Sequence, residues 1–382
     1  MQQLFLSMHL TLLRIQFPTG MLLMSILSIL GCQSAGNGSS RETEADRIKA
    51  FQAFPDALYP IRKGSKWGYM NRKGETVIAP TYASAEDFES GIAVVSVSEK
   101  GNTRYGYINR KGEWVIQPQF DRADPFFENR ASVCKNDKYG YIDSKGLEII
   151  PCQFEAAGRF SEGRAAIQKN GWTGFIDSTG TIVIEPRFTV SVNHPIFDHG
   201  MAPVFGADEM TGFINPSGEW VIEPRFHSAG RFREDKAWAS FQETDDSAQY
   251  GFTIRGGYID RQGDWVILPE YDFGWDFFEG HATVWKISED RQQKLWSVID
   301  TSGEKVLENL PYRNMGSITN GLIPVQDEKM AWGFINLKGE VVIPPKYTGI
   351  NRFRDGLARM EVGSAFDPEP VYINERGEIV MK

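Results

Sequence analysis

Residues 66–80 read KWGYMNRKGETVIAP, and the pattern returns at residues 104–118 as RYGYINRKGEWVIQP. The glycine near the start of this motif, or its substitute, recurs along the rest of the chain. It falls at Gly68, Gly106, Gly140, Gly174, Gly212, Gly257, Ser297, Gly333 and Val371. Self-similarity at a period of about 20 to 50 residues is typical of repeat architectures. The sequence therefore predicts an array of nine copies of one structural unit.

A second motif, Phe-x-x-Gly-x-Ala-x-Val, precedes the first one in each copy, as at residues 88–95 (FESGIAVV). Cutting the chain at the first position of this motif leaves every unit whole, from Phe54 to the end of the chain. The units are then predicted to start near Phe54, Phe88, Phe127, Phe160, Phe197, Phe232, Phe277, Ile318 and Phe353.

Each unit is predicted to hold three short strands, such as residues 92–97 and, in the glycine motif, residues 67–71 and 76–79. Asn71 suits the first position of a type I turn, and Gly74 suits the left-handed position of a bulged hairpin loop. Pro80 lacks the N–H that a strand ladder needs, so the third strand is expected to stop there.

A three-stranded unit of this size leaves its apolar face uncovered, so neighbouring units must stack to bury it. Each buried Phe, Val or Ile contributes about 1.5 to 3 kcal/mol, which makes stacking the main source of stability. We predict an all-β fold in which about nine three-stranded β-meanders form an open, curved solenoid. Propellers generally have about four to eight blades of four strands, and this count favours the open form. The alternative is a closed, propeller-like ring, if the linker between Tyr82 and Phe88 adds a fourth strand.

These motifs resemble the WG-repeat (KWG-repeat) family of bacterial proteins, whose unit reads W-G-Y-I-D-x-x-G-x-x-V-I-x-P-x-Y. The copies that begin at Trp67 and Trp332 match best, and the likeness covers residues 54–382. Individual copies depart from the pattern at Cys152, Thr173, Thr211 and Ser297. The resemblance implies a role in interactions or at the cell envelope, and it supplies no catalytic residues.

The N-terminus has the layout of a secretory signal, with Arg14 ahead of an apolar core at residues 21–30. This core is about half the roughly 20 residues that a membrane-spanning helix needs. Residues 29–32 (ILGC) resemble the lipobox of bacterial lipoproteins, which implies cleavage before Cys32 and lipidation of its thiol. Gln33 resembles the residue of lipoproteins sent to the outer membrane, if the cell has one. A plainly cleaved signal, giving a periplasmic or secreted protein, and a cytoplasmic protein are the alternatives.

The predicted domain organisation therefore has three parts. Residues 1–31 form a lipoprotein signal peptide, and residues 54–382 form the WG-repeat β domain. Residues 32–53 hold the lipidated cysteine, a flexible tether of small polar residues and a possible short capping helix.

The composition favours packing and binding over catalysis. Lys and Arg number 41 against 50 Asp and Glu, a net charge of −9, so the chain has no basic surplus for a phosphate backbone. Nucleic acid is excluded as the expected partner. No P-loop, Gly-x-Ser-x-Gly elbow, His-Glu-x-x-His or Cys-x-x-Cys motif occurs. We therefore predict a protein that is not an enzyme and needs no cofactor or metal.

Few side chains offer chemistry. His194, Asp198 and His199 form one local cluster, interpreted as a polar loop rather than a metal site. Cys134 is interpreted as a small core residue, and a disulfide between Cys134 and Cys152 is left open.

Acidic residues keep one enzymatic alternative open. A glycoside hydrolase needs two carboxylates at a set separation, and acids are frequent in this chain. Pairs such as Glu86-Asp87 and Glu234-Asp235 repeat as solvent-facing residues, whereas the irregular region 243–279 departs from the repeat. The alternative function is thus an envelope glycan hydrolase that uses carboxylates near residues 243–279.

Aromatic residues that break the period are the candidate binding residues, because Trp offers a broad, stiff contact area with one polar group. Trp238, Trp275 and Trp285 have no equivalents in most units and lie beside the longest insertion, residues 243–256. The sequence therefore predicts a noncatalytic, lipid-anchored envelope protein that acts as a scaffold for a protein or a polysaccharide.

Overall fold

The computed structural model describes residues 57–189, 194–244, 252–288, 293–364 and 367–381. The chain divides into two units, residues 1–50 and residues 51–382, and all described residues belong to the second unit. The predicted signal peptide, Cys32, the tether, the capping helix and Phe54 lie outside the described residues. Within these ranges, no helix has the length and apolar character needed to cross a membrane.

The described residues form nine antiparallel sheets, called blades 1 to 9 below, and each blade comes from one continuous stretch of chain. Blades 1 to 3 contain β1 (Leu58–Lys63), β2 (Lys66–Asn71), β3 (Thr76–Tyr82); β4 (Ser84–Ala85), β5 (Ile92–Glu99), β6 (Asn102–Asn109), β7 (Trp114–Phe120); β8 (Arg122–Ala123), β9 (Ala131–Lys135), β10 (Lys138–Ile142) and β11 (Glu148–Phe154). Blades 4 to 6 contain β12 (Ala156–Ala157), β13 (Arg164–Lys169), β14 (Trp172–Asp177), β15 (Ile182–Phe188); β16 (Ala202–Phe205), β17 (Thr211–Ile214), β18 (Trp220–Phe226); β19 (Ser228–Ala229), β20 (Ala237–Thr244), β21 (Phe252–Ile259) and β22 (Trp265–Tyr271). Blades 7 to 9 contain β23 (Phe273–Gly274), β24 (His281–Ile287), β25 (Lys294–Asp300), β26 (Lys305–Leu310); β27 (Asn314–Met315), β28 (Leu322–Gln326), β29 (Trp332–Asn336), β30 (Val341–Tyr347); β31 (Gly349–Arg354), β32 (Leu357–Ser364), β33 (Asp367–Asn374) and β34 (Ile379–Met381).

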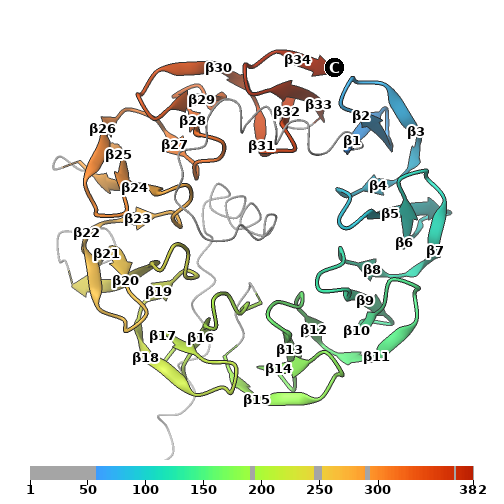
Figure 1. The fold of residues 1–382 in the computed structure, drawn as a ribbon, viewed down its shortest axis with the longest axis horizontal. Helices are drawn as coiled ribbons and strands as arrows, with labels where there is room; N and C mark the ends of the chain where they lie inside the picture. Colours follow the sequence, from blue (N-terminus) through green and yellow to red (C-terminus); the bar gives the residue numbers. More distant parts are fainter. Residues whose placement is uncertain (1–56, 190–193, 245–251, 289–292, 365–366, 382) are drawn as a thin grey trace, which may run out of the picture. The chain divides into compact units, whose positions relative to one another are not determined.

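The linker ahead of the Phe motif supplies the fourth strand that the alternative prediction required. In blade 2, β4 lies between Tyr82 and Phe88 and pairs with β5 through Ser84↔Ser96 and Ala85↔Val95. Among the described residues, every blade except blades 1 and 5 has such a fourth strand. These strands lie toward the centre of Figure 1, whereas the last strand of each blade lies at the periphery.

The blades close into a ring, so the prediction of an open, curved solenoid was wrong (Figure 1). Blade 9 packs against blade 1, where the Tyr372 hydroxyl donates to the Pro60 carbonyl at 2.6 Å. In the reverse direction, the Tyr59 hydroxyl donates to the Asp355 carbonyl at 2.9 Å. Tyr59, Met70 and Leu357 share one buried cluster across this junction. The described part of the chain is therefore a nine-bladed β-propeller in which neighbouring blades meet all the way round.

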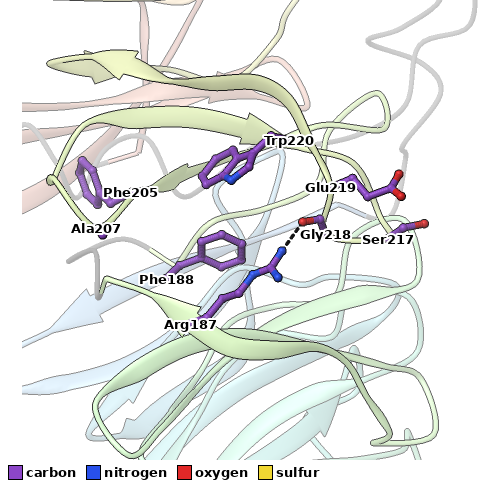
Figure 2. Close-up of a pocket in the computed structure, with 9 residues that line it drawn as sticks. Arg187, Phe188, Phe205, Ala207, Ser217, Gly218, Glu219 and Trp220 are labelled. Carbon is purple, nitrogen blue, oxygen red and sulfur yellow. Dashed lines mark hydrogen bonds between the residues drawn. The ribbon is translucent and has the colours of Figure 1, made fainter.

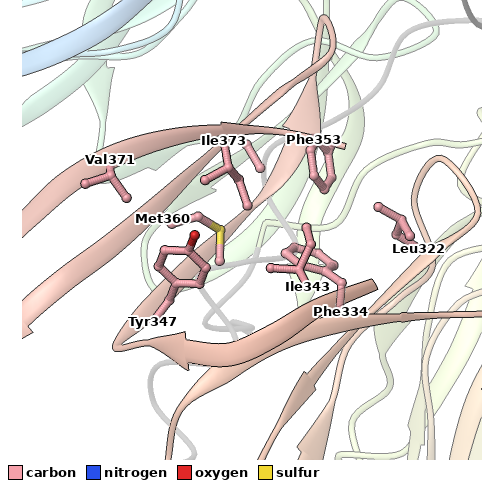
Figure 3. Close-up of a cluster of buried hydrophobic side chains, with 9 residues drawn as sticks. Leu322, Phe334, Ile343, Tyr347, Phe353, Met360, Val371 and Ile373 are labelled. Carbon is pink, nitrogen blue, oxygen red and sulfur yellow. The ribbon is translucent and has the colours of Figure 1, made fainter. Parts of the chain in front are cut away.

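An aromatic contact between consecutive blades repeats around the ring. The aromatic residue after each WG glycine packs on the first residue of the Phe motif in the next blade, as Tyr69 does on Phe88 with ring centroids 4.7 Å apart. Equivalent pairs are Tyr107–Phe126, Tyr141–Phe160, Phe175–Phe197, Phe213–Phe232, Tyr258–Phe277 and Phe334–Phe353. Figure 3 shows this contact between blades 8 and 9, where Phe334 and Phe353 lie among the aliphatic side chains of both blades. The predicted burial of apolar faces between neighbours is confirmed.

Tyrosines at this position add a hydrogen bond to the same junction. The hydroxyls of Tyr69, Tyr107, Tyr141 and Tyr258 donate to backbone carbonyls of the next blade at 2.6 to 2.9 Å. Each acceptor lies two residues before the Phe motif, just beyond the short inner strand. The contact therefore fixes the inner strand of one blade against the middle of its neighbour.

The third unit starts one residue earlier than predicted. Phe126, not Phe127, is buried and packs on Tyr107 with a centroid separation of 5.0 Å. Phe127 instead forms an isolated β-bridge with Arg130, and Glu89 forms the equivalent β-bridge with Ile92 in blade 2. Two adjacent phenylalanines satisfy the same motif, so the sequence pattern alone does not choose between them.

The predicted hairpin turn is confirmed, but the predicted end of the third strand is wrong. The Gly74 N–H donates to the Asn71 carbonyl at 3.0 Å, and Gly74 has φ of +80°. The third strand of blade 1 runs beyond Pro80 to Tyr82. Because this strand is the outer edge of its blade, the missing N–H of proline costs no ladder hydrogen bond.

The WG glycine is needed because the bulged third strand lies directly against it. A Cβ on Gly68 would be 2.4 Å from the Ile78 carbonyl oxygen. In blade 1, Trp67 pairs with Tyr82 and Tyr69 pairs with Ile78. An advance of two residues along β2 therefore corresponds to four residues along β3, and the extra residues of β3 form a bulge. Where Ser297 replaces the glycine, Trp296 pairs with Leu310 and Val298 with Leu307, and the bulge is one residue shorter. The hydroxymethyl group is thus accommodated by a tighter outer strand.

Candidate functional site

Trp238, one of the three candidate binding residues, is a core residue of the ring. It is 7% exposed and its ring lies 5.5 Å from that of Tyr258. A Cβ on Gly256 would be 2.2 Å from the indole, and a Cβ on Gly274 would be 2.5 Å from it. Two glycines therefore make room for a tryptophan that most other blades lack.

Trp275 and Trp285 are half-buried and lie in blade 7, the blade that Trp238 faces. The Trp275 indole N–H donates to the Met315 carbonyl of blade 8 at 2.9 Å. Phe273 contacts Trp275 and Trp238, with centroids 5.2 and 6.0 Å apart, and it pairs with Trp285 across β23 and β24. The structure thus gathers the three predicted tryptophans around Phe273.

The polar cluster of the fourth connector has no metal-binding arrangement. Asp198 accepts from the His199 Nδ1 at 2.7 Å and pairs with Arg233 at 3.1 Å. His194 is instead close to Gly158, and burial lowers the pKa of its imidazole. In the described part of the chain, no three His, Cys, Asp or Glu side chains are placed to hold a metal ion.

Cys134 and Cys152 are both free thiols. Cys134 is buried and Cys152 is half-buried. Cys134 of blade 3 pairs with Arg122, and Ser96 of blade 2 pairs with Ser84 at the equivalent position. The core position next to Cys134 is held by Val133, which is fully buried.

The described carboxylates of region 243–279 mostly hold the fold together. Asp260 accepts from two backbone N–H groups of its own turn. Asp272 accepts from the Ile287 N–H at 2.7 Å and pairs with Arg255 at 3.4 Å. Glu279 accepts from the backbone N–H groups of Asn320 and Gly321 in blade 8. These contacts bind the carboxylates to the backbone and to neighbouring blades.

Asp276, which is half-buried, is the exception. Burial raises the pKa of its carboxyl above the usual value, while the nearby guanidinium groups of Arg231, Arg233 and Arg352 act in the opposite direction. Its Oδ1 lies close to Gly230, where a Cβ would approach it to 2.8 Å. Asp276 thus lies among arginines, and the Asp198 carboxylate, which pairs with Arg233 at 3.1 Å, also raises its pKa.

A surface hollow of about 450 Å³ lies where blade 4 meets blade 5 (Figure 2), and we call it the blade 5 hollow. Its lining comes from the end of β15, the tip of the β16–β17 hairpin and the turn that leads into β18. The lining residues are Arg187, Phe188, Phe205, Gly206, Ala207, Ser217, Gly218, Glu219 and Trp220.

The hollow exists because blade 5 lacks a side chain that covers the equivalent tryptophan in blade 6. In blade 6, Phe241 extends over Trp265, with ring centroids 6.4 Å apart. Gly206 occupies the position in blade 5 that Phe241 occupies in blade 6. Met201 and Lys236 form equivalent β-bridges in the two blades, and Gly206 and Phe241 each lie five residues further along the chain. A Cβ on Gly206 would be 2.8 Å from the Pro224 side chain, so the site favours glycine. Trp220, the equivalent of Trp265, therefore lines an open hollow.

The lining combines aromatic surface with two opposite charges. The Trp220 and Phe188 rings meet edge to face at 5.6 Å, and the Arg187 guanidinium lies 5.1 Å from the Phe188 centroid. Arg187 Nη2 donates to the Gly218 carbonyl at 2.5 Å, and Glu219 accepts from the Asn215 amide at 2.9 Å. Figure 2 shows the aromatic rings on one side and Glu219 on the other. Aromatic faces with a few fixed polar groups suit a ligand with an apolar face and polar edges.

The tryptophans that break the period did not lead to this hollow. Trp220 belongs to a residue column that also holds Trp114 and Trp265, so it looks like an ordinary repeat residue. The usable signal was Gly206, a glycine at a position where other blades have larger side chains such as Val97 and Phe241.

The repeats identify the chain as a member of a known family. The WG containing repeat family matches residues 67–100, 105–139, 139–171, 174–204, 212–242, 257–284 and 332–364, more than half of the chain. The protein belongs to this family, and its repeats form the blades of the propeller. No curated protein matches the chain.

Solved structures similar to this chain at low sequence identity include the following three. BamB from Moraxella catarrhalis has 14% identity and a TM-score of 0.41, covering 81% of this chain and 94% of its own. The β-propeller domain of the Trilobed protease from Pyrococcus furiosus has 11% identity and a TM-score of 0.42, covering 79% and 99%. Hsv2p from Kluyveromyces lactis has 11% identity and a TM-score of 0.38, covering 65% and 94%.

We predict that Asp276→Asn stabilises the protein at pH 8. Because burial raises the folded-state pKa of Asp276, its contribution to stability is present below the unfolded pKa of about 4 and is lost as pH rises through the folded value. Thermal unfolding should give the variant a higher Tm than the wild type at pH 8, and the difference should vanish near the unfolded pKa. Asp264→Asn controls for the loss of one negative charge, at an exposed position. A wild type more stable than Asp276→Asn at pH 8 would contradict this account.

Proposed function

We propose that this protein is a noncatalytic scaffold that binds a glycan or a protein partner at the cell envelope, with the blade 5 hollow as the binding site. The observation that carries the proposal is the absence of a covering side chain at Gly206, which leaves Trp220 at an open hollow beside Arg187 and Glu219. Blades packed on both neighbours form a rigid frame, and a rigid frame reduces the conformational entropy that the protein loses on binding.

The lining favours a glycan over a flat protein surface. Pyranose rings have an apolar C–H face and polar edges, which match the aromatic rings and the charged rim of the hollow. The hollow is also small, about 450 Å³, and this volume suits one or a few sugar residues.

The location belongs to the same proposal. The lipobox-like segment before Cys32 supports a lipid anchor that would hold the ring at the membrane, on the outer membrane if the cell has one. A single acyl chain binds a membrane only marginally, so a stable anchor at Cys32 would need a second chain or another membrane-binding signal.

Trp220→Ala should abolish most of the binding to any glycan that the wild type retains. We expect at least a tenfold loss of affinity on an array of cell-wall and extracellular glycan fragments, since a central tryptophan often contributes about 2 kcal/mol or more. Trp265→Ala is the matched control, because Trp265 holds the same position in blade 6 and the Phe241 ring packs against it.

Three results would count against the proposed site or function. Equal losses for Trp220→Ala and Trp265→Ala would show that the hollow is not the site. Failure of the folded protein to retain any glycan or envelope protein would contradict the scaffold function. Release of soluble sugar products by the wild type would contradict its noncatalytic character and return the hydrolase alternative.

The anchor is tested separately through Cys32. We expect the full-length protein to incorporate a fatty-acid analogue and to sediment with membranes, because the hydrocarbon chains of a lipidated cysteine partition into the bilayer. Cys32→Ser should lose both the label and the membrane association, whereas Cys134→Ser, which changes a buried thiol, should keep both. Absence of the label from the wild-type protein would contradict the proposed lipid anchor, and it would leave the proposed binding site untouched.

A further inference from the structure

The junction of blades 5 and 6 repeats the residues that line the blade 5 hollow at the junction of blades 4 and 5. An arginine, a phenylalanine, an acid and a tryptophan recur at equivalent positions one blade further on. The equivalent pairs are Arg187 and Arg225, Phe188 and Phe226, Glu219 and Asp264, and Trp220 and Trp265. We call the second members of these pairs the blade 6 set.

The geometry of the two junctions is nearly the same. The Phe226 and Trp265 rings meet edge to face, with centroids 5.8 Å apart and an interplanar angle of 81°. In the blade 5 hollow the corresponding values are 5.6 Å and 79°. The Arg225 guanidinium lies 5.2 Å from the Phe226 centroid, and its Nη2 donates to the Gly263 carbonyl at 2.5 Å. Arg187 has the same two contacts at 5.1 and 2.5 Å.

One residue makes the main difference between the two junctions. The Phe241 ring packs against Trp265 with centroids 6.4 Å apart, whereas Gly206 puts no side chain at the equivalent place beside Trp220. Asp264 is exposed and carries the same charge as the glutamate of the hollow. Removal of the Phe241 ring would therefore leave the same aromatic faces, guanidinium and carboxylate around an open space.

We propose that the blade 6 set is a second copy of the glycan site and that Phe241 keeps it closed in the native ring. The ligand class comes from the proposed function, on which this inference rests. It is a saccharide of β-linked pyranoses with equatorial hydroxyls, because such rings leave their faces to C–H groups that pack on aromatic side chains. The arginine and the acid supply hydrogen bonds to hydroxyls at the ring edge. The native ring then binds one saccharide chain, at blade 5.

Calorimetric titration of the full-length protein tests this proposal. The probes are the trisaccharides of β-1,4-linked glucose and of β-1,4-linked N-acetylglucosamine. We expect the wild type to bind one molecule of at least one probe. Phe241→Gly should bind two, with the second affinity within about tenfold of the first. Phe241→Ala keeps the Cβ of β20 and should show the same gain, and thermal unfolding establishes that each variant is folded.

Two further variants assign the gained site. In the Phe241→Gly background, Trp265→Ala should remove the gained site and leave the site at blade 5. Val97→Gly is the matched control, because Val97 holds the Phe241 position in blade 2 and packs on the same cluster as Trp114. Thr81 replaces the arginine there, so this variant uncovers a tryptophan without the guanidinium. It should gain no site.

The proposal is overturned if the folded Phe241 variants keep a single site, or if Val97→Gly gains a site as well. It is also overturned if the gained site survives Trp265→Ala, or if the wild type binds neither trisaccharide. In this last case, retention of a different glycan that is lost in Trp220→Ala would leave the proposed function standing, so the two failures are distinguishable.

Discussion

The packing of one aromatic side chain on the next blade's phenylalanine is the contact on which this ring depends. It recurs at seven junctions with nearly constant geometry, at centroid separations of 4.7 to 5.3 Å, because the two motifs that supply it recur along the chain. Between blades 7 and 8, Val298 and Ile318 take these two positions and lie in one buried cluster. Where the residue is tyrosine, its hydroxyl also holds the inner strand of the next blade. A contact of nearly constant geometry imposes a similar rotation from blade to blade, and this rotation brings Tyr372 of blade 9 back to Pro60 of blade 1.

The parts of the fold that depend on local chemistry could be predicted from the sequence. The repeat, the bulged turn between Asn71 and Gly74 and the need for a glycine beside the third strand all follow from residue types at fixed spacing. The inner strands could not be recognised, because a pairing of two residues such as Ser84 and Ala85 has no period. Ring closure was missed for the same reason, since it depends on those strands and on a rotation angle that no residue pattern records. The choice between Phe126 and Phe127 needed the strand register as well.

The candidate sites show why residues that break the repeat are ambiguous. Trp238 departs from the pattern, but Gly256 and Gly274 depart with it and make the space that its indole fills. Ser297 departs, and its outer strand is shortened to match. Such compensated changes preserve the core. At Gly206 the change is not compensated: no side chain replaces the missing cover, and Trp220 lines a hollow as a result. An uncompensated change is thus the better indicator of a binding site in a repeat protein.

Closure of the ring is the central claim, and a pulsed electron–electron spin distance between blades 1 and 9 tests it most directly. Spin labels at Lys63→Cys and Glu369→Cys would lie on β1 and β33, which are in contact, in a protein whose native cysteines are replaced by serine. Serine already holds the register of Cys134 at Ser96, so this replacement suits the fold. A closed ring predicts one short, narrow distance between the labels. A long distance, like that between blades on opposite sides of the array, would contradict closure and restore the open solenoid.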